Sequence, residues 1–197
     1  MLPSTGTLSF LYNAEQDTWG FDPKDSGSFQ VAYSPPTGLT RQDLPPDLPE
    51  HGRFGLCELT FEPAVSLPPL ESHAFESLAT RVPRNALDPL YDELADHQEW
   101  ASRSLLLGYP DQIQGDMQTE CALVSGGLYC GDAAGYRDPR AAGLRKQAPE
   151  WQLLLQVASE DAAHMMWGDL GCLYYWMRTP ALVAQRFADA WLILQCS

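Results

Sequence analysis

The carboxyl-terminal quarter of the chain carries its densest apolar and aromatic pattern, and this pattern constrains the fold most. Trp151, Leu153, Leu155 and Val157 place apolar side chains at alternate positions, which is typical of a strand. Residues 171–177 are rich in aromatic side chains, and residues 191–196 form a third β-favouring run. Thr179 and Pro180 lie between the last two runs, and proline fits the first turn of a helix because its missing N–H has no partner there. The order strand, strand, helix, strand follows.

The amino-terminal part predicts further strands. Residues 6–12, 29–33 and 54–61 are short β-favouring runs bounded by turn-forming residues. Proline-rich stretches at 34–52 and 63–69 predict extended surface connections, since proline lacks a backbone donor.

Helices are predicted where an aspartate can cap a first turn. Asp88 before Pro89 predicts a helix from residue 89 to about residue 102, and His97 lies on its apolar stripe as a core histidine. Asp116 predicts a second helix, and the loop at 131–135 precedes a short one. The pattern as a whole predicts an α+β fold with mixed, largely antiparallel sheets and packed helices.

An internal repeat divides this single domain, residues 1–197, into two related halves. Gly6-x-Leu8-x-Phe10 resembles Gly171-x-Leu173-x-Tyr175, and a further strand follows each run. The expected halves are residues 1–62 and 104–197, joined by a proline-rich and helical connection. The second half has a strand before its glycine, whereas only five residues precede Gly6. We therefore expect the first half to lack its opening strand.

Several segments together resemble the YwqG-like family, a group of bacterial proteins of unknown function. The resemblance includes Trp19-Gly20-Phe21 and the run at 6–12, and it covers essentially the whole chain. The other matching segments, in order, are residues 108–117, 127–132, 151–156, 166–177 and 191–196. The resemblance implies a compact α+β protein with two related sheet-containing halves. Its members carry an additional amino-terminal strand that this sequence lacks, which implies an exposed sheet edge open to self-association. Some relatives lie among toxin and immunity genes, which implies an interaction role.

Charge restricts the class of partner. The chain has 26 acidic and 12 basic residues and a formal net charge of −14. Such a surface repels phosphate backbones and anionic lipids, so we expect neither nucleic-acid nor membrane binding. A basic protein partner is expected instead. The five cysteines form an odd set without a C-x-x-C pair, and no signal peptide or long apolar run is present, which predicts a reduced, soluble, cytoplasmic protein.

The first candidate site is the glycine-flanked loop at 108–116. Gln114 and Asp116 supply oxygen atoms that can bind a polar ligand or a cation. The alternative interpretation is structural, with Asp116 capping the following helix and the amides fixing loop backbone.

The second candidate site lies between the strands at 151–157 and 171–177. Asp161, His164 and Asp169 are candidates for acid–base chemistry, and Gln156 and Trp167 for ligand binding. The alternative is again structural, because aspartate before Leu170-Gly171 also suits a turn.

Other chemistry finds little support in the sequence. The glycine-rich loop at 127–135 lacks the lysine of a phosphate-binding P-loop, and no His/Cys set has zinc spacing. No metal and no cofactor are expected. The leading hypothesis is therefore a protein-interaction module of the immunity type that recognises a basic partner. The alternatives are an enzyme or polar-ligand binder using residues 156–169, and a structural protein that self-associates.

Overall fold

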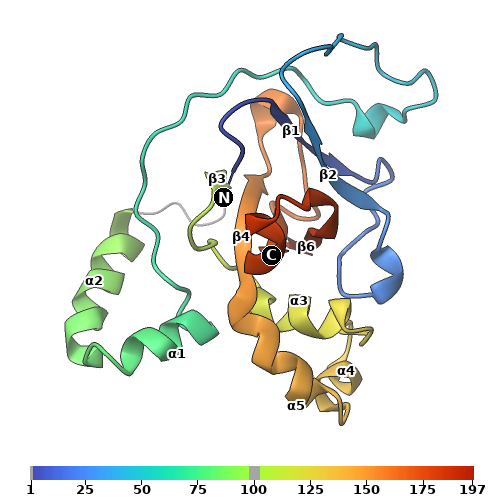
Figure 1. Cartoon of the computed structure of the whole chain (residues 1–197). Coiled ribbons are helices and arrows are strands. Elements are labelled where there is room, and N and C mark those ends of the chain that lie inside the picture. The colour runs from blue at the N-terminus through green and yellow to red at the C-terminus, as the bar shows by residue number, and fades with distance from the viewer. Residues whose placement is uncertain (1, 98–102) are drawn as a thin grey trace.

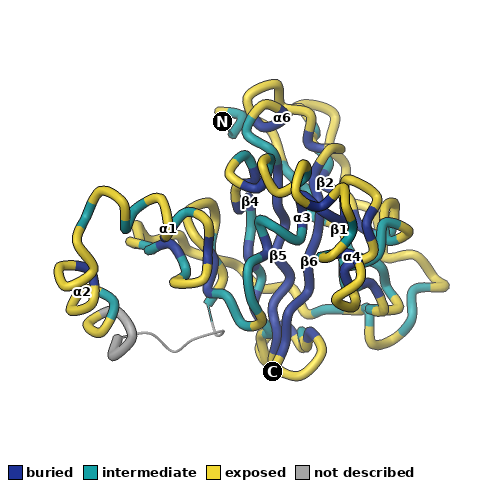
Figure 2. The backbone as a smooth tube through the Cα atoms, turned by 90° about the horizontal axis from the view of Figure 1, so that it is seen from below, coloured by how far each residue is buried: buried dark blue, intermediate teal, exposed yellow. Residues whose placement is uncertain are grey.

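The computed structural model describes residues 2–97 and 103–197 and confirms the α+β class (Figure 1). Its centre is a four-stranded antiparallel sheet with the order β3–β4–β5–β6. These strands are β3 (Leu105–Leu106), β4 (Trp151–Ala158), β5 (Cys172–Arg178) and β6 (Trp191–Gln195). The sheet is buried on both faces, as Figure 2 shows, so the carboxyl-terminal segment forms most of the core, as its apolar pattern predicts.

Strand β4 contains a β-bulge, so its side chains do not follow the simple alternation that the sequence predicts. Leu153 pairs with Trp176, but Leu155 pairs with Tyr175, so the register shifts between the two leucines. Gln156 then pairs with Tyr174 and shares a face with Trp176, because alternate residues of a strand point to the same side. The bulge therefore turns the polar Gln156 toward the face that carries Leu153.

The two faces of this sheet are covered by different elements. α3 (Met117–Ser125) contacts β4 and β6, and Asp116 caps it as predicted. The opposite face carries Tyr175, whose ring packs edge-on against Phe10 at 5.1 Å between centroids. Phe10 belongs to a two-stranded antiparallel sheet formed by β1 (Thr7–Tyr12) and β2 (Phe29–Ser34), which confirms the two predicted amino-terminal strands.

The segment between these strands returns to the main sheet at Gly20. The carbonyl of Trp19 accepts a hydrogen bond from Leu194 N–H at 3.0 Å. Gly20 has φ +88°, and a Cβ atom there would lie 1.9 Å from the carbonyl oxygen of Leu192. Only glycine allows the two backbones to approach this closely.

The helical connection consists of α1 (His73–Ala79) and α2 (Arg84–His97), which lie to one side of the sheets (Figure 1). The prediction that α2 starts at Pro89 is wrong, because Pro89 lies inside the helix. The first turn forms earlier because it buries Leu87, while Tyr91 packs against Phe75 of α1 at 5.4 Å. The predicted end near residue 102 and the side chain of His97 lie outside the described residues.

Three short helices complete the fold. They are α4 (Ala133–Arg137), α5 (Ala141–Leu144) and α6 (Thr179–Val183). α6 confirms the helix predicted at Thr179-Pro180, whereas α4 begins inside the predicted loop because Asp132 caps it. No helix within residues 2–97 and 103–197 is long and apolar enough to cross a membrane.

The prediction of a strand at residues 54–61 is wrong. Residues 55–65 are all exposed and form no helix or strand; we call them the exposed arm. A strand needs a neighbour with which to pair, and the run of alternating residues does not specify one. The relation between the two sequence halves stays a prediction.

Candidate functional site

Asp111 is the centre of a buried polar network beneath the 108–116 loop. Arg103 donates two hydrogen bonds to its carboxylate, from Nε at 2.6 Å and from Nη2 at 2.7 Å. Gln156, which is fully buried, accepts from Asp111 N–H and donates to the carbonyl of Arg103. The pKa of Arg103 is raised, mainly by its hydrogen bond to Asp111. Tyr174 O–H donates to the Asp111 carbonyl at 2.6 Å, and burial raises the pKa of this phenol.

The second half of the loop is fixed from β6. Gln195 accepts hydrogen bonds from the backbone N–H groups of Ile113 and Gln114 at 3.0 and 2.9 Å. The Gln114 side chain is exposed. Asp116 accepts from Gln118 N–H at 3.1 Å and from the Thr119 hydroxyl at 2.6 Å, which is an N-cap. These contacts agree with the structural interpretation of the 108–116 loop. A ligand-binding role of Gln114 and Asp116 stays a prediction.

The residues of the second candidate site lie in different environments. Asp161, His164 and Asp169 are exposed in the connection between β4 and β5. Trp167 is buried, and its indole N–H donates to the carbonyl of Ala158. Within the described residues, no hydrogen bond or ion pair joins Gln156 to any of the three exposed residues. Their catalytic role stays a prediction.

The part of the chain that the structure describes contains no cluster of residues suited to a metal ion. No group of three or more His, Cys, Asp or Glu residues there is placed to hold an ion.

A second carboxyl group, that of Glu120, is partly buried on α3. Glu120 lies one helical turn after Asp116 on α3, and its pKa is raised to about 7 by burial and by the Asp116 carboxylate. Burial raises the pKa of Cys130 to about 12, and Glu120 adds to this rise.

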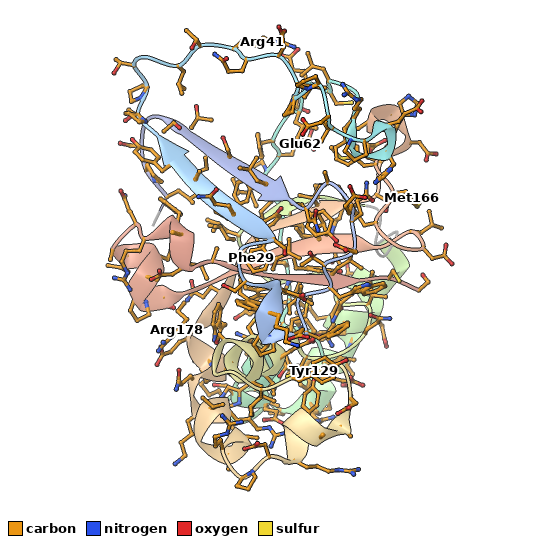
Figure 3. The ribbon with its side chains drawn as sticks, turned by 90° about the vertical axis from the view of Figure 1, so that its right-hand side faces the viewer. Phe29, Arg41, Glu62, Tyr129, Met166 and Arg178 are labelled. Atoms are coloured by element: carbon orange, nitrogen blue, oxygen red, sulfur yellow. The ribbon has the colours of Figure 1, made fainter. Side chains whose placement is uncertain are left out.

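The exposed arm has the largest apolar exposure of the described chain. Its exposed fractions are 87% at Leu56, 74% at Phe61 and 72% at Val65. The arm also carries the carboxylates of Glu58 and Glu62 and no basic residue. Glu62, labelled in Figure 3, lies far from the helical end of the molecule that carries Tyr129.

Both ends of the arm are held in place. Gly55 N–H donates to the carbonyl of Ala163 at 2.8 Å, next to Phe54, whose ring packs against Trp167 at 5.2 Å. At the other end, Ser66 Oγ accepts a hydrogen bond from Tyr109 N–H at 2.9 Å. Between these anchors, no backbone hydrogen bond joins residues 56–65 to any other described residue. The arm therefore presents unpaired backbone between two anchored ends.

A groove runs along one side of the arm. It has a volume of about 420 Å³, and its walls include Leu59 and Phe61 of the arm and Leu8 and Phe10 of β1. Within the described residues β1 pairs only with β2, so its other edge is free. Such a surface has the features by which extended peptides are recognised elsewhere, where they pair with free strand backbone and insert alternate side chains. The sequence showed that the arm contains β-favouring residues. It did not show that these residues would lack a neighbouring strand with which to pair.

A family model described as "Domain of unknown function (DUF1963)" matches residues 1–196. The matched range contains the buried loop network, both sheets and the exposed arm. No curated protein matches the chain.

Proposed function

The chain belongs to the DUF1963 family of unknown function, and on that premise we propose that it is a binding module that captures an extended, basic segment of a partner protein. The exposed arm carries this proposal. Its residues 56–65 have unpaired backbone groups and exposed apolar side chains, and its two ends are anchored to the folded core.

Apolar burial supplies the free energy for this interaction. Leu59 and Phe61 are 68% and 74% exposed, and a segment in the groove would cover them together with Phe10. Burial of apolar surface contributes about 25 cal/mol per Å² before the costs of association are subtracted. Because the ends of the arm are anchored, part of the ordering entropy is already lost in the free protein, which favours binding.

Charge selects the class of partner. Glu58 and Glu62 have no basic neighbour in the arm. Arg53, the nearest arginine along the sequence, donates its hydrogen bonds to the carbonyls of Leu48, Pro45 and Pro46. The formal net charge of −14 attracts a basic partner over a longer range. The resemblance to YwqG-like proteins supports an immunity-type role with a basic toxin as the partner, in the cytoplasm, where free thiols stay reduced.

The test uses a synthetic eight-residue peptide of alternating lysine and valine, and a matched peptide of alternating glutamate and valine. We expect the lysine peptide to bind, to weaken several-fold between 20 and 150 mM NaCl, and to lose affinity when alternate amides are methylated. Glu58→Gln and Glu62→Gln should each weaken binding about 1.4- to 5-fold, as a surface ion pair contributes about 0.2–1 kcal/mol. Fluorescence anisotropy measures these affinities.

Matched controls separate the arm from the general charge of the protein. Glu93→Gln and Asp169→Asn remove exposed carboxylates elsewhere and should leave affinity nearly unchanged. Phe61→Ser should abolish binding without lowering the melting temperature, because Phe61 is exposed. Equal binding of both peptides, or an affinity independent of salt, would contradict the proposal. Dimers that Phe61→Ser disrupts, without peptide binding, would show that a second copy of the chain occupies the groove.

A further inference from the structure

A second cavity, of about 500 Å³, lies between α1, α3 and the paired ends of β4 and β5. It borders the 108–116 loop through Gly108 and Tyr109 and shares Leu2 with the groove beside the arm, but none of the candidate site residues named from the sequence lines it. The polar residues in its wall that matter here are His73, Ser77, Arg81, Gln118, Trp151 and Trp176.

Two tryptophans in this wall have indole N–H groups without a hydrogen-bond partner. Trp151 and Trp176 are each only 2% exposed, and their Nε1 atoms are the buried side-chain polar atoms that remain unpaired in the described chain. They lie side by side on one face of the sheet, because Trp151 pairs with Arg178 and Trp176 with Leu153. By contrast, Trp191 Nε1 donates to the carbonyl of Gly20 at 2.9 Å.

An unpaired buried donor indicates which chemistry would be favoured in the cavity. Burying an N–H group without an acceptor costs free energy, and an indole N–H is a donor only. A ligand that brings an acceptor close to Trp151 and Trp176 would recover that cost. The side-chain amide of Gln118 already donates to the carbonyl of Trp151.

The charge of the wall adds a second restriction. The chain has 26 acidic residues, yet none of the residues that line this cavity is an aspartate or glutamate. Within the described residues, Arg81 forms no ion pair, and His73 lies 3.8 Å from the exposed carboxylate of Glu76. Leu153 and Leu182 supply an apolar part of the wall. The cavity therefore combines donors, one unpaired cation and apolar surface.

We propose that this cavity binds a small organic carboxylate. The carboxylate accepts hydrogen bonds from the indole N–H groups of Trp151 and Trp176 and pairs with Arg81, while its hydrocarbon part lies against Leu153 and Leu182. Both nitrogens are buried within the wall, so an indole ring must rotate toward the ligand as it binds.

The experiment titrates the whole chain with benzoate, phenylacetate, hexanoate and decanoate. Indole N–H signals in ¹⁵N-resolved NMR spectra report binding, and single Trp→Phe variants assign the signals. We expect saturable binding of at least one carboxylate, with the Trp151 and Trp176 signals moving and that of Trp191 unmoved. Benzamide, which has the shape of benzoate without its charge, should bind about tenfold or more weakly.

Matched variants test the roles of the three residues. Trp151→Phe, Trp176→Phe and Arg81→Gln should each weaken carboxylate binding about tenfold or more, and Trp191→Phe should not. The melting temperature adds a readout that does not depend on the ligand. Trp191→Phe should lower it because a paired N–H is lost and the Gly20 carbonyl is left without its donor, whereas loss of an unpaired N–H in Trp151→Phe or Trp176→Phe should lower it less.

Three outcomes would overturn the proposal. They are the absence of saturable binding across all four carboxylates, equal binding of benzamide and benzoate, and full affinity in the Trp151→Phe and Trp176→Phe variants. If either of these variants fails to fold, the Arg81→Gln affinities and the indole signals of the unmodified protein decide the question.

Discussion

At the scale of single residues, Glu120 lies in an environment that disfavours its charge. Burial and the nearby Asp116 carboxylate raise its pKa to about 7 from its ordinary value of 4.5. Glu120 lies four residues after Asp116, the N-cap of α3, so their side chains lie on the same side of the helix, and like charges at this spacing repel.

The raised pKa of Glu120 makes the free energy of unfolding depend on pH. The folded state keeps this proton to higher pH than the unfolded state, so stability falls as pH rises from about 4.5 through about 7 and levels off above it. Glu120→Gln should remove this loss and stabilise the protein at pH 8 by up to about 3 kcal/mol. Urea unfolding from pH 4 to 9 measures the difference from the unmodified protein. Glu93→Gln is the exposed control, and an identical pH dependence in Glu120→Gln would contradict the prediction.

Individual residues differed in how far their roles could be predicted. The N-cap by Asp116 is local, since its partners are two and three residues away, and the sequence predicted it correctly. The partner of Gln156 is Asp111, which is 45 residues away. No spacing rule connects such residues, so the sequence could nominate Gln156 as a polar residue of interest but not identify its contacts.

At the scale of elements, the 108–116 loop depends on side chains from the sheet for its shape. Gln195 is 3% exposed and serves as the acceptor for two consecutive backbone N–H groups, those of Ile113 and Gln114. Its amide also donates to the carbonyl of Gly115. The Gln195 side chain thus supplies the hydrogen bonds that a neighbouring strand would otherwise provide to the loop.

Replacing Gln195 by leucine should loosen this loop. Two backbone donors would lose their acceptor, so we expect the free energy of unfolding to fall by about 2 kcal/mol. Hydrogen exchange should also accelerate at the Ile113 and Gln114 amides before the rest of the sheet is affected. Gln30→Leu, at an exposed position of β2, is the control and should change neither quantity. Unchanged exchange at the two amides would show that other contacts fix the loop.

Helices and strands were predicted most accurately where the local sequence pattern was long and clearly bounded. β5 and β6 were predicted closely because their apolar runs are long and bounded by turn residues. α2 began five residues before the predicted Pro89, because the tertiary contact of Leu87 outweighed the proline signal. The exposed arm has the composition of a strand but not the neighbour, and strand pairing is a property of the whole fold.

At the scale of the whole molecule, the charge imbalance opposes compaction. The chain has a formal net charge of −14, and folding brings these like charges closer together. The described acidic residues form few ion pairs, and among these only Asp111 is buried. Long-range repulsion is therefore only partly compensated by local contacts.

Salt should consequently stabilise the folded protein. Raising NaCl from 20 to 200 mM shortens the screening length from about 20 Å to about 7 Å, so repulsion between distant carboxylates weakens. We expect a rise of a few degrees in the melting temperature by calorimetry. KCl should act equally, and sucrose at the same osmolality should not reproduce the salt dependence. A melting temperature that falls with salt would mean that attractive ion pairs dominate.

The position of the cysteines has a practical consequence. Cys57 is the exposed cysteine and lies within the arm, while the other four thiols are buried. Burial raises the pKa of Cys121, Cys130 and Cys172, which keeps these three in the unreactive thiol form. A maleimide dye will therefore attach at a single point without any engineering. The fluorescence of a dye at Cys57 will report whether the arm is covered. In air, the Cys57 thiol can also form a disulfide that links two molecules.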